Sequence, residues 1–149
     1  KMPCSLRFDN AWASSREMRR THKQDQVNNL AALLGIVLRA HHSQGQVVVD
    51  FCGGSGHTAL PLAFRFPLCQ FVIVDLKPAS LELARKRIAA AGLTNVRLVR
   101  ANVRDFCEPF DVGLALHACG EATDMVHGKC IEHQAAYILA SCCVGKLQK

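Results

Sequence analysis

The sequence has no long apolar run and no leader-like start. Its apolar stretches fall well short of the roughly 18 consecutive residues of a membrane-spanning helix, which excludes that class. Residues 1–5 lack the apolar core of a signal peptide. The eight cysteines contain no Cys-x-x-Cys pair and are spread from Cys4 to Cys143, which argues against a disulfide scaffold. We therefore expect a protein with reduced thiols in the cytoplasm, with the nucleus as an alternative.

Acidic residues are also few, because 12 Asp and Glu face 18 Lys and Arg, for a net charge of +6. Residues 1–40 hold seven of the basic residues and three of the acidic ones, a balance of +4. Such a segment can favour a polyanion such as RNA. It lacks interleaved aromatic residues and a recognisable RNA-binding module, so a solvated helix face is the alternative.

Short apolar runs alternate with helical patterns along a chain long enough for one domain. The strand-like runs, rich in β-branched residues, lie at residues 46–51, 71–75, 96–99, 112–116 and 136–140. Helical patterns lie at residues 27–38, 57–66, 78–91 and 123–132, whereas residues 1–20 show no clear periodicity. Strands joined by helices run parallel, which predicts an α/β fold, a Rossmann-like doubly wound parallel sheet with strand order 3-2-1-4-5.

Ligands of such a sheet bind at the carboxyl ends of its strands, and polar and small residues are found there. Asp50 ends the first strand, and Gly53, Gly54 and Gly56 follow it. Glycines there let backbone N–H groups approach a nucleotide at a helix N-terminus. Asp75 ends the second strand, where a carboxylate can accept hydrogen bonds from both hydroxyls of a ribose. The alternative is a tight turn followed by a helix-capping aspartate.

The glycine pattern alone fits two cofactors. Gly54-x-Gly56-x-x-Ala59 satisfies the dinucleotide fingerprint, so a NAD-dependent oxidoreductase is one interpretation. The charge of Asp50 suits the ammonium group of S-adenosylmethionine (SAM) better than it suits a pyrophosphate. Asn102, after the third strand, is placed to bond the adenine amine while apolar neighbours cover the ring, or alternatively to bond its own backbone.

Three segments carry a family resemblance, namely residues 49–57 (VDFCGGSGH), 116–124 (LHACGEATD) and 141–145 (SCCVG). They resemble class I SAM-dependent methyltransferases, in the branch of the methyltransferase-like domain of glutathione S-transferase C-terminal domain-containing proteins. A more distant likeness is to the eukaryotic tRNA 2′-O-methyltransferase. The resemblance runs from about residue 23 to residue 146. We therefore expect a basic extension over residues 1–22 and a SAM-binding domain over residues 23–149.

The resemblance implies an enzyme that transfers a methyl group from SAM, leaving S-adenosylhomocysteine, with RNA such as tRNA as the favoured acceptor. A SAM-binding module without catalysis is an alternative. The basic N-terminal segment would contact the RNA, and the oligomeric state is left open. The implied cofactor-binding residues are Lys23, Gln26, Asp50, Phe51, Cys52, Gly53, Gly54, Gly56, Asp75, Leu76, Asn102, Val103, Leu116 and His117.

The chain departs from the general family pattern in two places. The general methyltransferase loop has glycine where this chain has Cys52. The family fold also adds two strands after the fifth, so we expect the chain to be a piece of a longer protein. In addition, the Asn/Asp-Pro-Pro-Tyr motif linked to amino-nitrogen methylation is absent after the fourth strand, so the acceptor is not fixed by sequence.

His117, at the end of the fourth strand, is the candidate catalytic residue, either as a base or as a group that orients the acceptor. A structural imidazole is the alternative, since methyl transfer can rely on positioning alone. Cys119 and Cys142 follow the fourth and fifth strands, where RNA cytosine-5 methyltransferases carry thiols, but the Asp-x-Pro-Cys segment of those enzymes is absent. A zinc site that adds His117 and Cys143 to these thiols is disfavoured, so no metal is expected.

Overall fold

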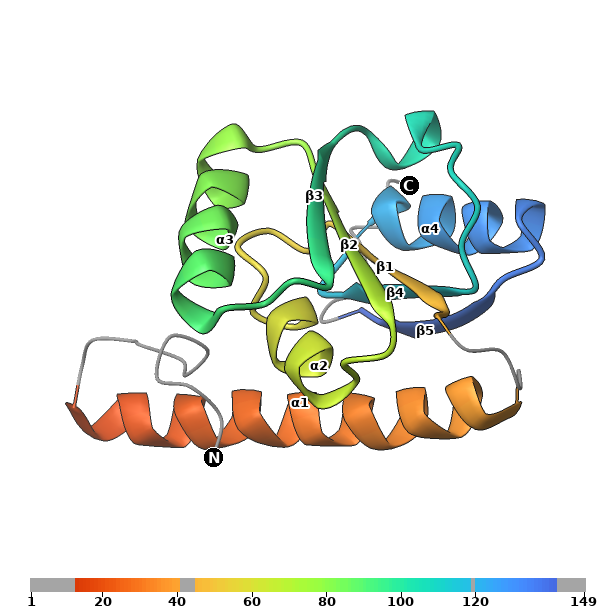
Figure 1. Ribbon diagram of the computed structural model, residues 1–149. Coiled ribbons are helices and arrows are strands. Elements are labelled where there is room, and N and C mark those ends of the chain that lie inside the picture. Colours follow the sequence, from red (N-terminus) through yellow and green to blue (C-terminus); the bar gives the residue numbers. More distant parts are fainter. Residues whose placement is uncertain (1–12, 41–44, 119, 142–149) are drawn as a thin grey trace, which may run out of the picture.

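The computed structural model describes residues 13–40, 45–118 and 120–141, with side chains from residue 24 onward. Its elements alternate as the sequence predicts (Figure 1). They are α1 (Ala13–Ala40), β1 (Val47–Phe51), α2 (Ala59–Arg65), β2 (Gln70–Asp75), α3 (Pro78–Ala91), β3 (Val96–Arg100), the 3₁₀ helix η2 (Val103–Asp105), β4 (Val112–Leu116), α4 (Glu121–Glu132) and β5 (Ala136–Ala140).

The five strands form one parallel sheet in the order β3-β2-β1-β4-β5, which confirms the predicted fold class. Strand β1 lies at the centre, with Val48 opposite Phe71 of β2 and Val112 of β4. Because all strands point the same way, the residues that follow them meet along one edge of the sheet. That edge is called the carboxyl edge below.

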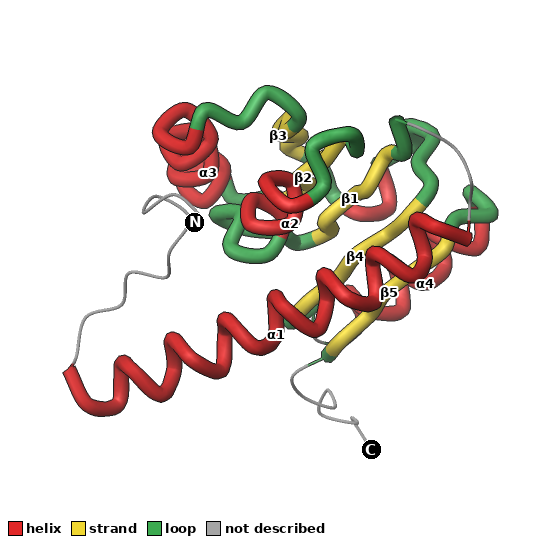
Figure 2. The backbone as a smooth tube through the Cα atoms, turned by 60° about the horizontal axis from the view of Figure 1, so that its bottom comes forward, coloured by secondary structure: helices red, strands yellow, loops and turns green. Residues whose placement is uncertain are grey.

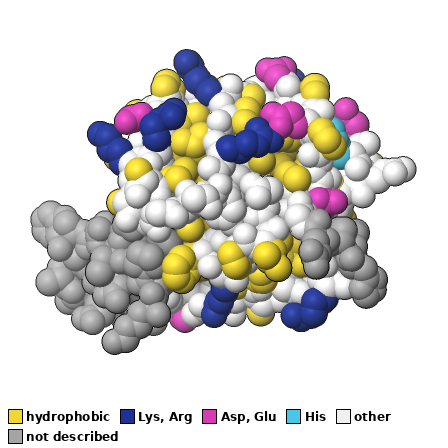
Figure 3. All heavy atoms as spheres, in the orientation of Figure 1, with side chains coloured by type: hydrophobic (Ala, Val, Ile, Leu, Met, Phe, Trp, Pro, Cys, Tyr) yellow, Lys and Arg dark blue, Asp and Glu magenta, His cyan; other side chains and the backbone are white. Residues whose placement is uncertain are grey.

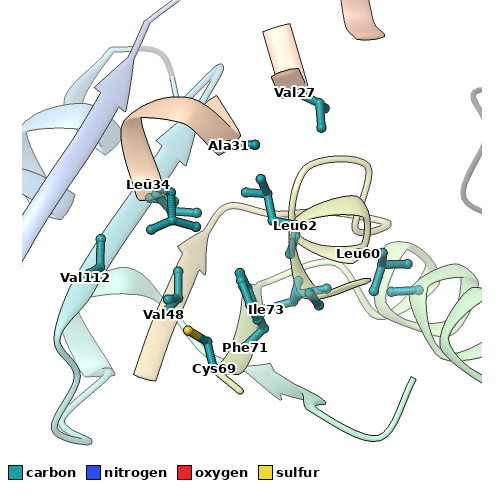
Figure 4. Packing of buried hydrophobic residues seen from close by; sticks show 14 of the residues in the cluster. Val27, Ala31, Leu34, Val48, Leu60, Leu62, Cys69, Phe71, Ile73 and Val112 are labelled. Atoms are coloured by element: carbon teal, nitrogen blue, oxygen red, sulfur yellow. The ribbon is translucent and has the colours of Figure 1, made fainter. Parts of the chain in front are cut away.

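Helices cover both faces of the sheet (Figures 1 and 2). Helices α1, α2 and α3 pack on one face, where Leu34, Leu62 and Ile73 belong to a single buried cluster (Figure 4). Helix α4 and η2 pack on the other face, around a second cluster that contains Phe51 and Phe106. This two-sided burial explains why β1 is a continuous apolar run rather than an alternating one.

The main difference from the sequence-based expectation is the length of α1. We expected a helix from residue 27, where the apolar spacing begins, but α1 starts at Ala13 and is 28 residues long. Residues 13–26 are rich in Arg, Glu, Lys and Gln, which favour helix without an apolar stripe, and a helix nucleated by packing extends at low cost. The expected domain boundary at residues 22–23 stays a prediction, and α1 runs through it.

The other boundaries agree closely with the prediction, except that α4 begins at Glu121 rather than at residue 123 and that α2 begins later than expected. That helix begins at Ala59 rather than at residue 57, so Pro61 is its third residue, where no intrahelical N–H bond is needed. Helix α3 begins at Pro78 and is capped by Gly92 at φ 63°, as expected. Among the helices of the described residues, none is long and apolar enough to cross a membrane.

Candidate functional site

The loop between β1 and α2, residues 52–58, crosses the carboxyl edge and is called the glycine loop here. Its backbone takes the left-handed conformation at Cys52 (φ 58°), Gly54 (φ 57°) and Gly56 (φ 79°). A residue with a side chain pays roughly 1–2 kcal/mol for that conformation. Cys52 thus adopts the geometry for which glycine is suited, which accounts for the glycine that the general methyltransferase loop carries there.

The glycine loop is closely packed against the sheet. A Cβ atom at Gly56 would lie 2.7 Å from Cγ of Leu60 and 3.1 Å from Cδ1 of Ile73. The Gly56 N–H donates to the carbonyl of Gly53 at 2.9 Å, and the Gly53 N–H donates to the carbonyl of Val74 at 3.3 Å. No side chain fits at position 56, so the loop backbone is held close to the ends of β1 and β2.

Asp75, at the end of β2, ties the glycine loop to the start of α3. Its Oδ2 accepts a hydrogen bond from the Gly54 N–H at 2.9 Å, and its Oδ1 accepts one from the Lys77 N–H at 2.8 Å. An ionised carboxylate has about four acceptor positions, so about two are left. The side chain is half-buried, and those positions are free for a diol such as a ribose.

Asp50, at the end of β1, is 1% exposed, and its Oδ2 has no hydrogen-bond partner among the described residues. Burial raises the pKa of this carboxyl group to about 7; the Ala59 N–H opposes the rise, and the negative charge of Asp75 adds to it. A Cβ atom at Gly53 would lie 2.7 Å from Oδ2. The site thus contains a buried acceptor that a cationic donor would satisfy.

Arg87 of α3 reaches the glycine loop, and the sequence analysis did not identify it. Its Nη1 donates to the carbonyl oxygen and to Oγ of Ser55, both at 3.2 Å, and lies 3.1 Å from Nε2 of His57. The only signal in the sequence is that Arg87 adjoins the apolar face of its helix, next to Ile88. Such a position allows a long side chain to bend over the neighbouring loop.

The residues predicted on the adenine side differ in their surroundings. Leu76 is 58% exposed and is free to cover a ring. The Oδ1 of Asn102 accepts from the Arg104 N–H at 3.0 Å, so the local alternative is realised, although a second lone pair and the Nδ2 donor stay available. Val103 is 6% exposed and belongs to the second cluster, so its side chain lies in the core.

Of the two predicted residues Phe51 and His117, the first is buried and the second is exposed. The Phe51 ring is fully buried and packs edge-on against Phe106 at 5.5 Å, so its side chain lies in the second cluster. His117 is exposed, with φ 63°, and its N–H donates to the carbonyl of Ala140 at 2.9 Å. Leu116 precedes it, is half-buried and pairs with Ala140 in register.

One predicted residue is not joined to this site, and the side chains of four others lie outside the described residues. Gln26 is exposed on α1 and makes no hydrogen bond to the glycine loop within the described chain. Lys23 lies in α1, but its side chain is outside the described residues, as are Cys119, Cys142 and Cys143. The thiol and zinc interpretations therefore stay untested.

Comparison with known proteins identifies the family. A family model described as "Methyltransferase domain" matches residues 22–149. The chain is 40% identical over 130 residues, 87% of its length, to the glutathione S-transferase C-terminal domain-containing protein of Xenopus laevis. It spans about a fifth of the length of that relative and of its human counterpart. This agrees with the resemblance found in the sequence.

Two further likenesses are partial. The ribosomal RNA small subunit methyltransferase G of Porphyromonas gingivalis is 33% identical over 78 residues, which cover 52% of this chain and 35% of that protein. The fold is similar to the crystal structure of magnesium protoporphyrin IX methyltransferase from Synechocystis PCC 6803 with bound SAM. That comparison has a TM-score of 0.68 and 16% identity, and it covers 90% of this chain and 65% of the other, so it bears on the fold alone.

Proposed function

The chain belongs to the methyltransferase domain family, and on that basis we propose that it binds SAM at the carboxyl edge of its sheet and methylates RNA. The cofactor part rests on the glycine loop and the two aspartates beside it. The acceptor part rests on charge and on one relative. Family membership favours SAM over a nicotinamide dinucleotide, which the glycine spacing alone left open.

The buried carboxyl group of Asp50 is the observation that carries the cofactor proposal. Its Oδ2 is without a partner among the described residues, and an unsatisfied buried acceptor costs about 1–3 kcal/mol. The ammonium group of SAM offers both a hydrogen-bond donor and a positive charge. A pyrophosphate offers neither and would add a negative charge beside Asp50 and Asp75.

The remaining residues fit a nucleoside held along the same edge. Asp75 has acceptor positions for two ribose hydroxyls, Leu76 is exposed for contact with an adenine face, and Asn102 retains an amide donor for the adenine edge. When bound, SAM supplies an electrophilic methyl group on a positively charged sulfur. The task of the protein is then mainly to hold two reactants in line.

His117 is the residue that we propose contacts the acceptor. It follows β4, the neighbour of β1, so it lies on the carboxyl edge next to the glycine loop. Its exposed imidazole can accept a proton or a hydrogen bond from an incoming hydroxyl or amine. The bond from its N–H to Ala140 fixes the backbone while the side chain stays accessible.

The exposed basic side chains near the carboxyl edge favour RNA as the methyl acceptor. Figure 3 shows basic side chains over α3 and β3, with acidic side chains beside some of them, and Lys77, Arg100 and Arg104 are exposed at or just past the ends of β2 and β3. Such cations neutralise phosphates without reading sequence. The relative from Porphyromonas gingivalis carries ribosomal RNA in its name, which supports the same class of acceptor.

Methyl transfer tests the proposal directly. The full chain is incubated with tritium-labelled SAM and unfractionated tRNA or ribosomal RNA, and label that becomes sensitive to ribonuclease is counted. We expect incorporation that Asp75→Asn abolishes and that Asp124→Asn, an exposed change on α4, leaves unaltered. SAM binding without methyl transfer to RNA would refute RNA as the acceptor. A chain that does not bind SAM would refute the whole proposal.

A further inference from the structure

A separate site lies at the opposite edge of the sheet, where the strands begin. It is a cavity of about 370 Å³ bordered by Gln46, just before β1, and by Cys69, just before β2. That volume falls in the range of small-molecule pockets. The five residues of β1 separate it from the glycine loop by roughly 16 Å, at about 3.3 Å per residue. We call it the amino-edge cavity.

Gly35 of α1 lines this cavity and presents no side chain to it. A Cβ atom there would lie 3.5 Å from Nη1 of Arg39 and 3.8 Å from the ring of Phe66. The guanidinium group and the aromatic ring therefore border the same empty volume. Leu38 and Leu68 add further apolar wall, and Leu68 is 74% exposed, so the cavity opens to solvent.

The charged side chains that line the amino-edge cavity are both cationic. Arg39 and Arg65 come from the last turns of α1 and α2, and none of the described residues that line the cavity is Asp or Glu. Arg65 has one weak partner, Oδ1 of Asn28 at 3.3 Å. Arg39 makes no ion pair within the described part of the chain. Two cations without acidic partners favour an anionic ligand.

Gln46 supplies a second, independent sign of a ligand. It is 4% exposed, and its Nε2 has no hydrogen-bond partner among the described residues. Its backbone is fixed, because its carbonyl accepts from the Gln70 N–H at 2.9 Å. A buried amide donor without a partner is rare in native proteins and calls for an acceptor.

We propose that the amino-edge cavity binds a small organic anion, namely a carboxylate carried on an apolar body. The apolar body packs against Phe66 and Leu38, and the carboxylate meets Arg39 and Arg65, with the amide of Gln46 turning toward it. This site does not depend on the proposed methyl transfer, because it shares no residue with the glycine loop.

The test compares two probes of the same shape, 4-phenylbutyrate and the neutral 4-phenylbutan-1-ol. Amide shifts of the ¹⁵N-labelled full chain are followed during titration at millimolar concentration. We expect saturable shifts at Gly35, Gly45 and Leu68 with the acid, and binding of the alcohol about tenfold weaker because charged hydrogen bonds are lost. No saturable shift with the acid, or equal affinity for the alcohol, would overturn the proposal.

Matched variants locate the site. Gly35→Leu fills the cavity and should abolish binding, whereas Gly35→Ala makes only ordinary contacts and should retain it. Arg39→Gln should weaken binding of the acid about tenfold and leave the alcohol unchanged, and Arg85→Gln on α3 serves as the charge control. Asp75→Asn should have no effect. Undiminished binding by both Gly35→Leu and Arg39→Gln would contradict the assignment, as would shifts confined to the glycine loop.

Discussion

The two aspartates beside the glycine loop, Asp50 and Asp75, have opposite environments. Asp75 accepts two backbone hydrogen bonds and is half-buried, whereas Asp50 is buried with one oxygen unpaired. Backbone donors stabilise an ionised carboxylate, and burial destabilises it. The two carboxyl groups can therefore perform different tasks. Asp75 is a hydrogen-bond acceptor that the backbone holds in place, and Asp50 is a group whose ionised form a bound cation would stabilise.

Asp50 should make the stability of the free protein fall as pH rises. Burial raises its pKa from 3.8 to about 7, so between those values the folded state holds a proton that the unfolded state has lost. The contribution of the neutral Asp50 carboxyl group to the free energy of unfolding is complete below pH 4 and lost above pH 7. The two pKa values differ by about three pH units, and at 1.36 kcal/mol for each the free energy of unfolding changes by ~4 kcal/mol. Urea unfolding from pH 4 to pH 8 measures it, and Asp50→Asn should remove that part of the slope. An equal slope in the variant would contradict the environment described for Asp50.

Gly56 should tolerate no side chain. In Gly56→Ala the new Cβ meets Leu60 at 2.7 Å, and the residue must also hold a left-handed φ, so we expect a loss of about 3 kcal/mol. Gly92→Ala is the control, because Gly92 has a similar φ of 63° but its added Cβ would meet no described atom within 4 Å, and it should lose about 1 kcal/mol. Denaturant midpoints of the two variants separate packing from backbone strain. Equal losses would show that position 56 is not crowded.

At the scale of elements, η2 links the second cluster to the carboxyl edge. Phe106 follows it directly, is 2% exposed, and packs edge-on against Phe51 at 5.5 Å. Asn102 caps the same short helix. The position of the proposed adenine contact thus depends on an aromatic anchor below it.

Phe106→Ala should therefore lower the unfolding free energy by roughly 3–5 kcal/mol through the cavity that it creates. Phe64 of α2 is 42% exposed, so Phe64→Ala should lower the unfolding free energy by less than about 1.5 kcal/mol. Thermal unfolding of both variants measures the difference. Comparable losses would mean that the ring of Phe106 is not an anchor.

The sequence predicted the elements well where burial dictates the pattern. The bounds of β4 and β5, and the start of α3 at Pro78, agree with the prediction because apolar runs and proline mark them locally. The early start of α1 was missed because residues 13–26 have helix propensity without an apolar stripe. Left-handed residues such as Cys52 and His117 have no sequence signal, and the reach of Arg87 to the glycine loop depends on packing between distant segments.

At the scale of the whole molecule, the charged groups that we propose bind ligands at the two edges of the sheet have opposite signs. The carboxyl edge holds Asp50 and Asp75, while the amino-edge cavity is bordered by Arg39 and Arg65. A cationic cofactor and an organic anion would thus each meet the opposite sign of charge. The core of the sheet between the edges is apolar, which keeps the two sites separate.

SAM affinity should depend on pH through Asp50. Only the ionised carboxylate attracts the cation, and its pKa is about 7 in the free protein, so affinity should rise about tenfold from pH 6 to pH 8. Binding near pH 7 should also release a proton, which calorimetry in buffers of different ionisation heat detects. Asp50→Asn should bind weakly at both pH values, and a wild-type affinity independent of pH would argue against the contact.

Calorimetric titration of the full chain with SAM at pH 8 tests the central claim most directly, with Asp75→Asn and the exposed Asp124→Asn as the paired variants. The account predicts micromolar binding of SAM and S-adenosylhomocysteine, no binding of NAD, a loss of at least tenfold in Asp75→Asn and no change in Asp124→Asn. Binding of NAD in place of SAM, or SAM affinity that survives Asp75→Asn intact, would contradict the assignment of the carboxyl edge as the cofactor site.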